Sequence, residues 1–228
     1  MTTPPAGAAA LEAAVEFAEN PEPRCPCVLL IDTSGSMRGE PIDALNDGLR
    51  RFQEELASDA LAARRVEVAV VGFASGVQVV QDFVTADRFA APTLDASGLT
   101  AMGGGIHRAL DLVAERKALY KASGVAYYRP WVFMITDGEP QGEPDEVVES
   151  AAQRVHDEET ARRVAFFAVG VQGANLKRLS TLVPRTPLRL NGLDFGEMFV
   201  WLSSSMQKVS QSRIDDQVSL APPGWAAV

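Results

Sequence analysis

Short apolar runs of strand length alternate along this chain with segments whose apolar residues recur at helical spacing. The runs lie at residues 28–31, 66–73, 77–84, 131–135, 164–171 and 188–190. Continuous apolar runs are typical of strands that are covered on both faces. Their alternation with helices predicts a parallel sheet with helices on both faces and right-handed crossovers. We therefore expect an α/β fold of the doubly wound, Rossmann-like kind.

One pair of neighbouring runs is joined too tightly for a crossover. Ser75 and Gly76 lie between the runs at 66–73 and 77–84. So short a connection predicts a β-hairpin, and hence an antiparallel pair. The sheet is therefore expected to be mostly parallel and six-stranded, with one antiparallel strand at its edge.

The helical segments are placed by their apolar spacing. One begins at Pro41, whose fixed φ suits a first helical turn. Its apolar residues form a single stripe and are Ile42, Leu45, Leu49, Phe52 and Leu56. The other helices are expected around residues 106–113, 144–159, 175–182 and 195–209.

The elements group into one domain, expected over residues 24–210, between a tail or short loose helix at 1–23 and a flexible tail at 211–228. The first tail is rich in Ala, Pro and Glu, and the second has no periodicity. The N-terminus lacks the basic region of a signal peptide. No apolar run has the length of a membrane span. These features lead us to expect a cytoplasmic protein with no membrane partner.

Composition excludes several classes of function. The chain of 228 residues is 46% apolar and 22% charged, as in a folded globular protein. Its net charge of −9 argues against binding to nucleic acid, which needs a basic face. Cys25 and Cys27 have no second cysteine or histidine pair to complete a metal site, so we expect two reduced thiols at the start of a strand.

Oxygen-bearing side chains follow three of the predicted elements. Asp32, Ser34 and Ser36 come directly after the first strand, and Asp137 follows the strand at 131–135. Thr100 stands in a long loop, just before a helix. In folds of this kind ligands bind beyond the carboxyl ends of the strands. Carboxylates and hydroxyls without imidazole or thiolate favour Mg²⁺, with Mn²⁺ and Ca²⁺ as alternatives.

Charge counting indicates what such a site would do. Two carboxylates balance a divalent ion, whereas three hydroxyls add no charge. Mg²⁺ takes about six oxygen ligands and keeps waters where the protein does not fill its shell. A position left open to solvent could accept a carboxylate from another protein. The residues therefore favour a metal-bridged docking point over a catalytic centre.

The order Asp32-Thr33-Ser34-Gly35-Ser36, then Thr100, then Asp137 resembles the metal-ion-dependent adhesion site (MIDAS) of von Willebrand factor type A domains. The resemblance covers about residues 25–210. It implies that Ser34, Ser36 and Thr100 ligate Mg²⁺ through their hydroxyls. It also implies that Asp32 and Asp137 hold the ion mostly through waters, and that a partner protein supplies a Glu or Asp.

Within that family the chain is similar to bacterial tellurium-resistance proteins of the TerY type. The segments at 98–103, 135–140 and 199–206 carry this similarity, and Leu99 departs from it by replacing a common glycine. Such proteins are often encoded beside a protein kinase and a PP2C-type phosphatase. The resemblance thus implies a monomeric, non-catalytic adaptor in bacterial signalling or stress response.

The main alternative is a metal-dependent phosphohydrolase that uses Asp32 as its nucleophile. Enzymes of the haloacid dehalogenase type need a second Asp two residues later, where this chain has Ser34. They also need a lysine that is absent near Asp137, and a hydroxyl cannot replace the missing carboxylate in acid–base work at neutral pH. A serine hydrolase lacks its Gly-x-Ser-x-Gly turn. The glycines at 103–105 lack the Lys and Ser/Thr of a phosphate-binding loop.

Overall fold

A computed structural model describes residues 15–171 and 173–227. Within these residues the chain forms a seven-stranded sheet in the order β3-β2-β1-β4-β5-β6-β7. The strands are β1 (Cys25–Asp32), β2 (Val66–Phe73), β3 (Val77–Thr85), β4 (Trp131–Thr136), β5 (Ala165–Gly170), β6 (Leu188–Leu190) and β7 (Ala226–Ala227). The five inner strands are parallel, and the edge strands β3 and β7 are antiparallel to their neighbours.

The predicted α/β architecture is confirmed, including the six predicted strands and the antiparallel edge at β3. The added strand β7 pairs only Ala226 and Ala227 with β6. Two residues are too few to show a periodicity, which explains why the sequence did not indicate this strand.

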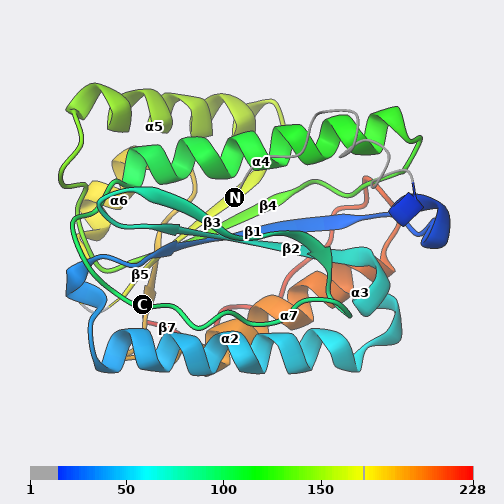
Figure 1. The fold of residues 1–228 in the computed structure, drawn as a ribbon, viewed down its shortest axis with the longest axis horizontal. Coiled ribbons are helices and arrows are strands. Elements are labelled where there is room, and N and C mark those ends of the chain that lie inside the picture. The colour runs from blue at the N-terminus through cyan, green and yellow to red at the C-terminus, as the bar shows by residue number, and fades with distance from the viewer. Residues whose placement is uncertain (1–14, 172, 228) are drawn as a thin grey trace.

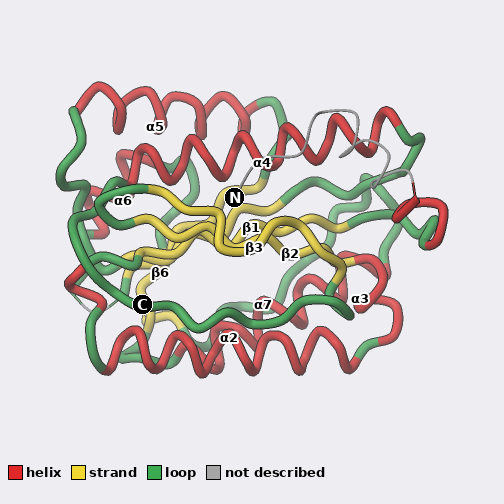
Figure 2. The backbone as a smooth tube through the Cα atoms, viewed as in Figure 1, coloured by secondary structure: helices red, strands yellow, loops and turns green. Residues whose placement is uncertain are grey.

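Helices cover both faces of the sheet (Figure 1). The helices are α2 (Glu40–Ser58), α3 (Ala60–Arg65), α4 (Met102–Ala122), α5 (Asp145–Thr160), α6 (Leu176–Leu182) and α7 (Phe195–Gln211), with a 3₁₀ turn η1 (Gly35–Met37). Figure 2 shows the strands stacked between a layer with α4 and α5 and a layer with α2 and α7. The helix α3 was not predicted. Asp59 begins it by accepting hydrogen bonds from the N–H groups of Leu61 and Ala62.

Side chains of each inner strand alternate between the two helix layers. Leu29 and Ile31 of β1 pack in the apolar cluster that contains α2 and α7. Val28 and Leu30 pack in the cluster that contains α4 and α5. A strand buried on both sides needs apolar residues at every position, and this is why the strands appear in the sequence as unbroken apolar runs.

The segment before β1 belongs to the folded core and is not a loose tail. Residues 15–19 are helical, and the side chains of Phe17 and Arg24 are 4% and 0% exposed. The ring of Phe17 lies 5.2 Å from the guanidinium carbon of Arg24 and 5.0 Å from that of Arg116. The rest of the expected tail, residues 1–14, lies outside the described residues.

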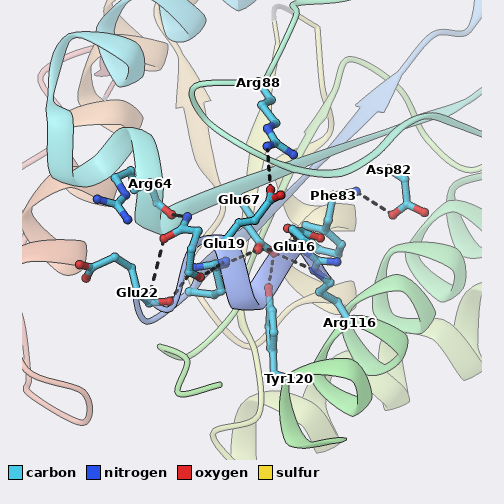
Figure 3. A network of polar contacts seen from close by, with 12 residues as sticks. Glu16, Glu19, Glu22, Arg64, Glu67, Asp82, Phe83, Arg88, Arg116 and Tyr120 are labelled. Carbon is cyan, nitrogen blue, oxygen red and sulfur yellow. Dashed lines mark hydrogen bonds and ion pairs between the residues drawn. The ribbon is translucent and has the colours of Figure 1, made fainter. Parts of the chain in front are cut away.

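A buried ionic cluster ties this segment to the sheet (Figure 3). Glu67 of β2 is fully buried and accepts hydrogen bonds from Arg24, Arg116 and Tyr120. Glu16 then pairs with Arg116 at 2.7 Å. Two arginines and two glutamates leave the cluster neutral, which is the condition for burying charge in a core.

The C-terminal segment is also packed, in contrast to the flexible tail we expected. Trp225 is 3% exposed, and its ring lies 5.7 Å from that of Trp201. The Trp201 side chain donates a hydrogen bond to the carbonyl of Ala221 at 2.8 Å, and Tyr128 donates one to the carbonyl of Ser212 at 2.6 Å. A few isolated apolar residues therefore hold a segment that has no regular pattern.

The two cysteines flank Pro26 at the beginning of β1, as expected at the start of a strand. Both are free thiols with no exposed surface. Burial raises the pKa of Cys27 to about 12, so the thiol stays protonated at neutral pH. Among residues 15–171 and 173–227, no helix combines the length and the apolar character that crossing a membrane requires.

Candidate functional site

The predicted oxygen-bearing residues gather at the carboxyl ends of two neighbouring strands. Asp32 is the last residue of β1, and Asp137 directly follows β4. These strands pair in parallel, with Ile31 opposite Ile135. Parallel pairing in this register necessarily brings the two aspartates to the same edge of the sheet.

A chain of hydrogen bonds connects four of the five predicted residues. The carboxylate of Asp32 accepts the N–H of Ser34 at 2.9 Å. The hydroxyls of Ser34 and Ser36 are 3.0 Å apart, and Ser36 donates to the Oδ1 atom of Asp137 at 2.8 Å. Asp32 and Ser34 are buried, Asp137 is half-buried and Ser36 is exposed. The inner side of the site is therefore closed to solvent, and its outer side is open to solvent.

Thr100 joins this group from the long loop before α4. Its backbone makes a two-way bridge with Gln141, through N–H to carbonyl contacts of 3.1 and 2.9 Å. A Cβ atom placed on Gly138 would lie 3.7 Å from the Thr100 hydroxyl and 3.8 Å from the Oδ2 atom of Asp32. Because both oxygens lie close to one point, the structure brings all five predicted residues together. Their role as metal ligands stays a prediction.

Backbone hydrogen bonds hold the loops that carry these residues. The N–H of Gly35 donates to the carbonyl of Gly98 at 3.0 Å, and that of Ala101 donates to the carbonyl of Ala74 at 2.7 Å. The loops after β1 and β2 and the loop before α4 thus form one framework. Such a framework fixes the side chains it carries more firmly than a free loop would.

The glycines at the start of α4 allow close packing of the helix against its neighbours. A Cβ on Gly105 would come within 3.0 Å of the Phe73 side chain. The N–H groups of Gly103 and Gly104 donate to the carboxylate of Glu143 at 2.7 and 3.0 Å. An acidic side chain of the protein itself therefore occupies the place where a phosphate would bind a helix start.

Burial shapes the electrostatics of the two aspartates. It raises the pKa of Asp32 above its usual value, an effect that hydrogen bonds from Ser34 and Thr136 counter and that the carboxylate of Asp137 reinforces. Burial also raises the pKa of Asp137, while the hydrogen bond from Ser36 lowers it. A cation between the two carboxylates would relieve both the lost hydration and the mutual repulsion.

Sequence reasoning missed the importance of Thr136 and Glu143. Thr136 is fully buried and donates to the Oδ2 atom of Asp32 at 2.6 Å. Its place directly before Asp137, at the end of the central strand, was the available signal. His107, which follows Thr100 by seven positions, lies against α5, where its Nε2 atom is 3.0 Å from the Ser150 hydroxyl.

The donor set fits a hard divalent cation. The five side chains offer carboxylate and hydroxyl oxygens only, which are the ligands that Mg²⁺, Mn²⁺ and Ca²⁺ prefer. Across the described part of the chain, no group of three or more His, Cys, Asp or Glu is arranged to hold a metal ion. A metal in this region would therefore have to rely on the hydroxyls of Ser34, Ser36 and Thr100.

Solved structures share this fold at low sequence identity. A von Willebrand factor type A protein from Catenulispora acidiphila matches with a TM-score of 0.58 and 18% identity, over 82% of this chain and 43% of that chain. The pilus adhesin SpaC from Lactobacillus rhamnosus GG matches with a TM-score of 0.62 and 15% identity, over 82% and 30% of the two chains. Proximal thread matrix protein 1 of the mussel byssus, in a structure described as having a zinc-occupied MIDAS motif, matches with a TM-score of 0.53 and 16% identity, over 82% and 48%.

This chain spans less than half the length of each of these three proteins. No curated protein matches its sequence. The family model of the von Willebrand factor type A domain matches residues 27–193, which include every strand from β2 to β6, most of β1, and all five predicted site residues. The chain therefore belongs to the von Willebrand factor type A domain family.

Proposed function

We propose that this protein is a non-catalytic, Mg²⁺-dependent protein–protein interaction module. One observation carries the proposal. Two carboxylates and three hydroxyls converge at the end of the sheet, with Asp32 and Ser34 buried and Ser36 exposed. Such a set can bind a divalent ion from below while leaving its outer side open.

The five residues would divide the work of holding the ion. The hydroxyls of Ser34, Ser36 and Thr100 would ligate it, and Asp32 and Asp137 would hold it mostly through water molecules while balancing its charge. Mn²⁺ or Ca²⁺ would bind the same oxygens. When bound, the ion supplies a positive centre to which a carboxylate can coordinate.

A partner protein would provide that carboxylate from a Glu or Asp side chain. Leu99 adds an apolar contact at the rim, because its side chain is 48% exposed beside Thr100. Its backbone N–H is held by the hydroxyl of Ser75 at 2.9 Å, so its position is defined. We infer a partner surface that carries an acidic residue.

The zinc-occupied MIDAS motif named for the mussel protein supports metal binding at the matching place in this fold. The likeness to TerY-type proteins suggests a finer role. In that reading the module serves bacterial signalling or stress response, including tellurium resistance, in the cytoplasm. Its partners would be a protein kinase or a PP2C-type phosphatase of the same system.

A phosphohydrolase using Asp32 is the second candidate, and the local contacts disfavour it. The residue two positions after Asp32 is Ser34, whose hydroxyl lies 3.0 Å from that of Ser36. A serine hydroxyl does not supply the acid–base function of a carboxylic acid near neutral pH. We therefore propose that the protein is not an enzyme.

A Mn²⁺ titration followed by electron paramagnetic resonance tests the metal site. Wild type should bind one Mn²⁺, and Asp137→Ala should lose this binding. Glu149→Ala is the matched control, since Glu149 is an exposed acidic residue of α5. Equal Mn²⁺ binding by wild type and Asp137→Ala would show that the proposed residues do not form the site.

Partner binding and catalysis need separate assays. Immobilised wild type should retain a partner in Mg²⁺ and release it in EDTA, and Asp32→Ala should retain none. Hydrolysis of p-nitrophenyl phosphate in Mg²⁺ should not exceed the background rate. Turnover that Asp32→Asn abolishes would favour the phosphohydrolase instead.

A further inference from the structure

Thr136 is a buried polar residue that contacts the candidate metal site. It is not one of the five proposed ligands. It ends β4 and is 0% exposed. Its hydroxyl donates to the Oδ2 atom of Asp32 at 2.6 Å, the usual length of a hydrogen bond from a hydroxyl to a carboxylate, which is stronger than one between neutral groups. The same oxygen accepts the N–H of Gly138 at 3.2 Å.

These two contacts fix the direction of the hydroxyl. An ionised carboxylate only accepts hydrogen bonds, so the hydrogen of Thr136 must point to Asp32. The oxygen lone pair is then free to receive the N–H of Gly138. One side chain thus couples the carboxylate at the end of β1 to the turn that follows β4.

Asp32 depends on this coupling for its orientation. Its Oδ1 atom accepts the N–H of Ser34 at 2.9 Å, so the two carboxylate oxygens are held from different elements, one from the turn after β1 and one from β4. Asp32 is 0% exposed, and bulk water cannot replace a donor that is removed. Without the Thr136 hydroxyl, the donors from Ser34 would remain on one side only, and the plane of the carboxylate would be less firmly fixed.

The hydroxyl is not needed to pair the strands. Backbone contacts already join β1 to β4 from Cys27 opposite Trp131 to Ile31 opposite Ile135. Thr136 is fully buried, and a valine in its place would have nearly the same volume. The hydroxyl group of Thr136 therefore serves the candidate metal site and not strand pairing.

We propose that Thr136 is a positioning residue of the metal site. It aims the Asp32 carboxylate, and it holds Gly138 where Asp32 and Thr100 approach each other. This inference rests on the proposed function, because it concerns how firmly the same site holds its ion. Residues that orient metal-binding carboxylates commonly contribute tenfold to a hundredfold in metal affinity.

The test compares Mn²⁺ affinity, by electron paramagnetic resonance titration, in wild type, Thr136→Val and Thr136→Ser. Thr136→Val keeps the volume and removes the hydroxyl, so its dissociation constant should rise by about tenfold to a hundredfold. Thr136→Ser restores the hydroxyl and should bind nearly as well as wild type. Thr85→Val is the control, because Thr85 is also buried but pairs with Glu67 at the other end of the sheet. It should not change the affinity.

Thermal unfolding of each metal-free variant separates a local effect from a loss of fold. If Thr136→Val does not fold, Thr136→Ala takes its place in the comparison with Thr136→Ser. The inference is overturned if the variant without a hydroxyl binds Mn²⁺ as wild type does, or if Thr136→Ser binds as weakly as that variant. Absence of Mn²⁺ binding in wild type is a different result, since it would overturn the proposed function itself.

Discussion

Glu67 is the central acceptor of the buried ionic cluster, and we expect it to contribute strongly to the stability of the fold. Its carboxylate is fully buried and accepts hydrogen bonds from Arg24, Arg116 and Tyr120. Glu67→Gln would leave two buried arginines with one counter-charge fewer. Because an uncompensated buried charge is costly, we expect a loss of about 3–5 kcal/mol in the free energy of unfolding.

Urea unfolding followed by circular dichroism measures this loss. The control is Asp47→Asn, which breaks the exposed pair between Asp47 and Arg50. A surface pair of this kind contributes under about 1 kcal/mol. A similar small change for both variants would mean that the buried cluster is not a main support of the fold.

The cysteines give a second prediction at the scale of the residue. A thiol reagent at pH 8 should modify neither Cys25 nor Cys27 in the native protein, and both in urea, because both are fully buried. The pKa of Cys27 is raised from 9.0 to about 12, so the folded state keeps its proton where the unfolded chain loses it. Stability from this group is complete below pH 9 and is lost as the pH rises from 9 to about 12. Rapid native modification at pH 8 would contradict the buried placement.

At the scale of the element, the C-terminal segment behaves as part of the core. Trp225→Ala should lower the free energy of unfolding by about 3–5 kcal/mol, as expected when a large buried aromatic side chain is removed. Gln217→Ala, an exposed change in the same segment, should stay within about 0.5 kcal/mol of wild type. Chemical denaturation of both variants decides the matter, and equal stability would mean that the segment is as loose as the sequence suggested.

Elements with many regularly spaced apolar residues were predictable from sequence. The runs that form β1, β2 and β4 and the stripe of α2 all lie where the patterns placed them. The packed ends of the chain were not predictable, because Phe17 lies in an Ala- and Glu-rich segment and Trp225 follows two prolines and a glycine, with no regular apolar spacing around either. Their burial depends on partners far away in sequence, which no local pattern can indicate.

Within the candidate site, too, some residues could be predicted from the sequence and others could not. The five proposed ligands form a motif in sequence, and their convergence follows from parallel strand order. Thr136 belongs to no such spacing, and its contact with Asp32 spans 104 positions. Its place directly before Asp137 was visible in the sequence, whereas the contact itself follows from the register between β1 and β4.

At the scale of the whole molecule, metal binding should stabilise the fold. A ligand that binds only the native state adds about 2.7 kcal/mol when its concentration is a hundred times the dissociation constant. For a domain of this size that corresponds to about 5–11 °C in the melting temperature. Differential scanning calorimetry should show this rise with saturating Mg²⁺ in wild type, and none in Asp137→Ala. An equal rise in both would assign the effect to another site.

The short helix at residues 15–19 is anchored at the amino ends of the strands, where Glu67 is the second residue of β2, whereas Asp32 and Thr136 lie at the carboxyl ends. Figure 1 shows these two ends on opposite sides of the molecule. A linker joined just before Val15 to a sensor chip or bead would therefore leave the candidate metal site pointing away from the support. Coupling through Arg38 or Glu139, which are exposed near that site, would turn it toward the support and mask it. The end of the molecule that carries the buried cluster around Glu67 is therefore the suitable attachment point for immobilisation.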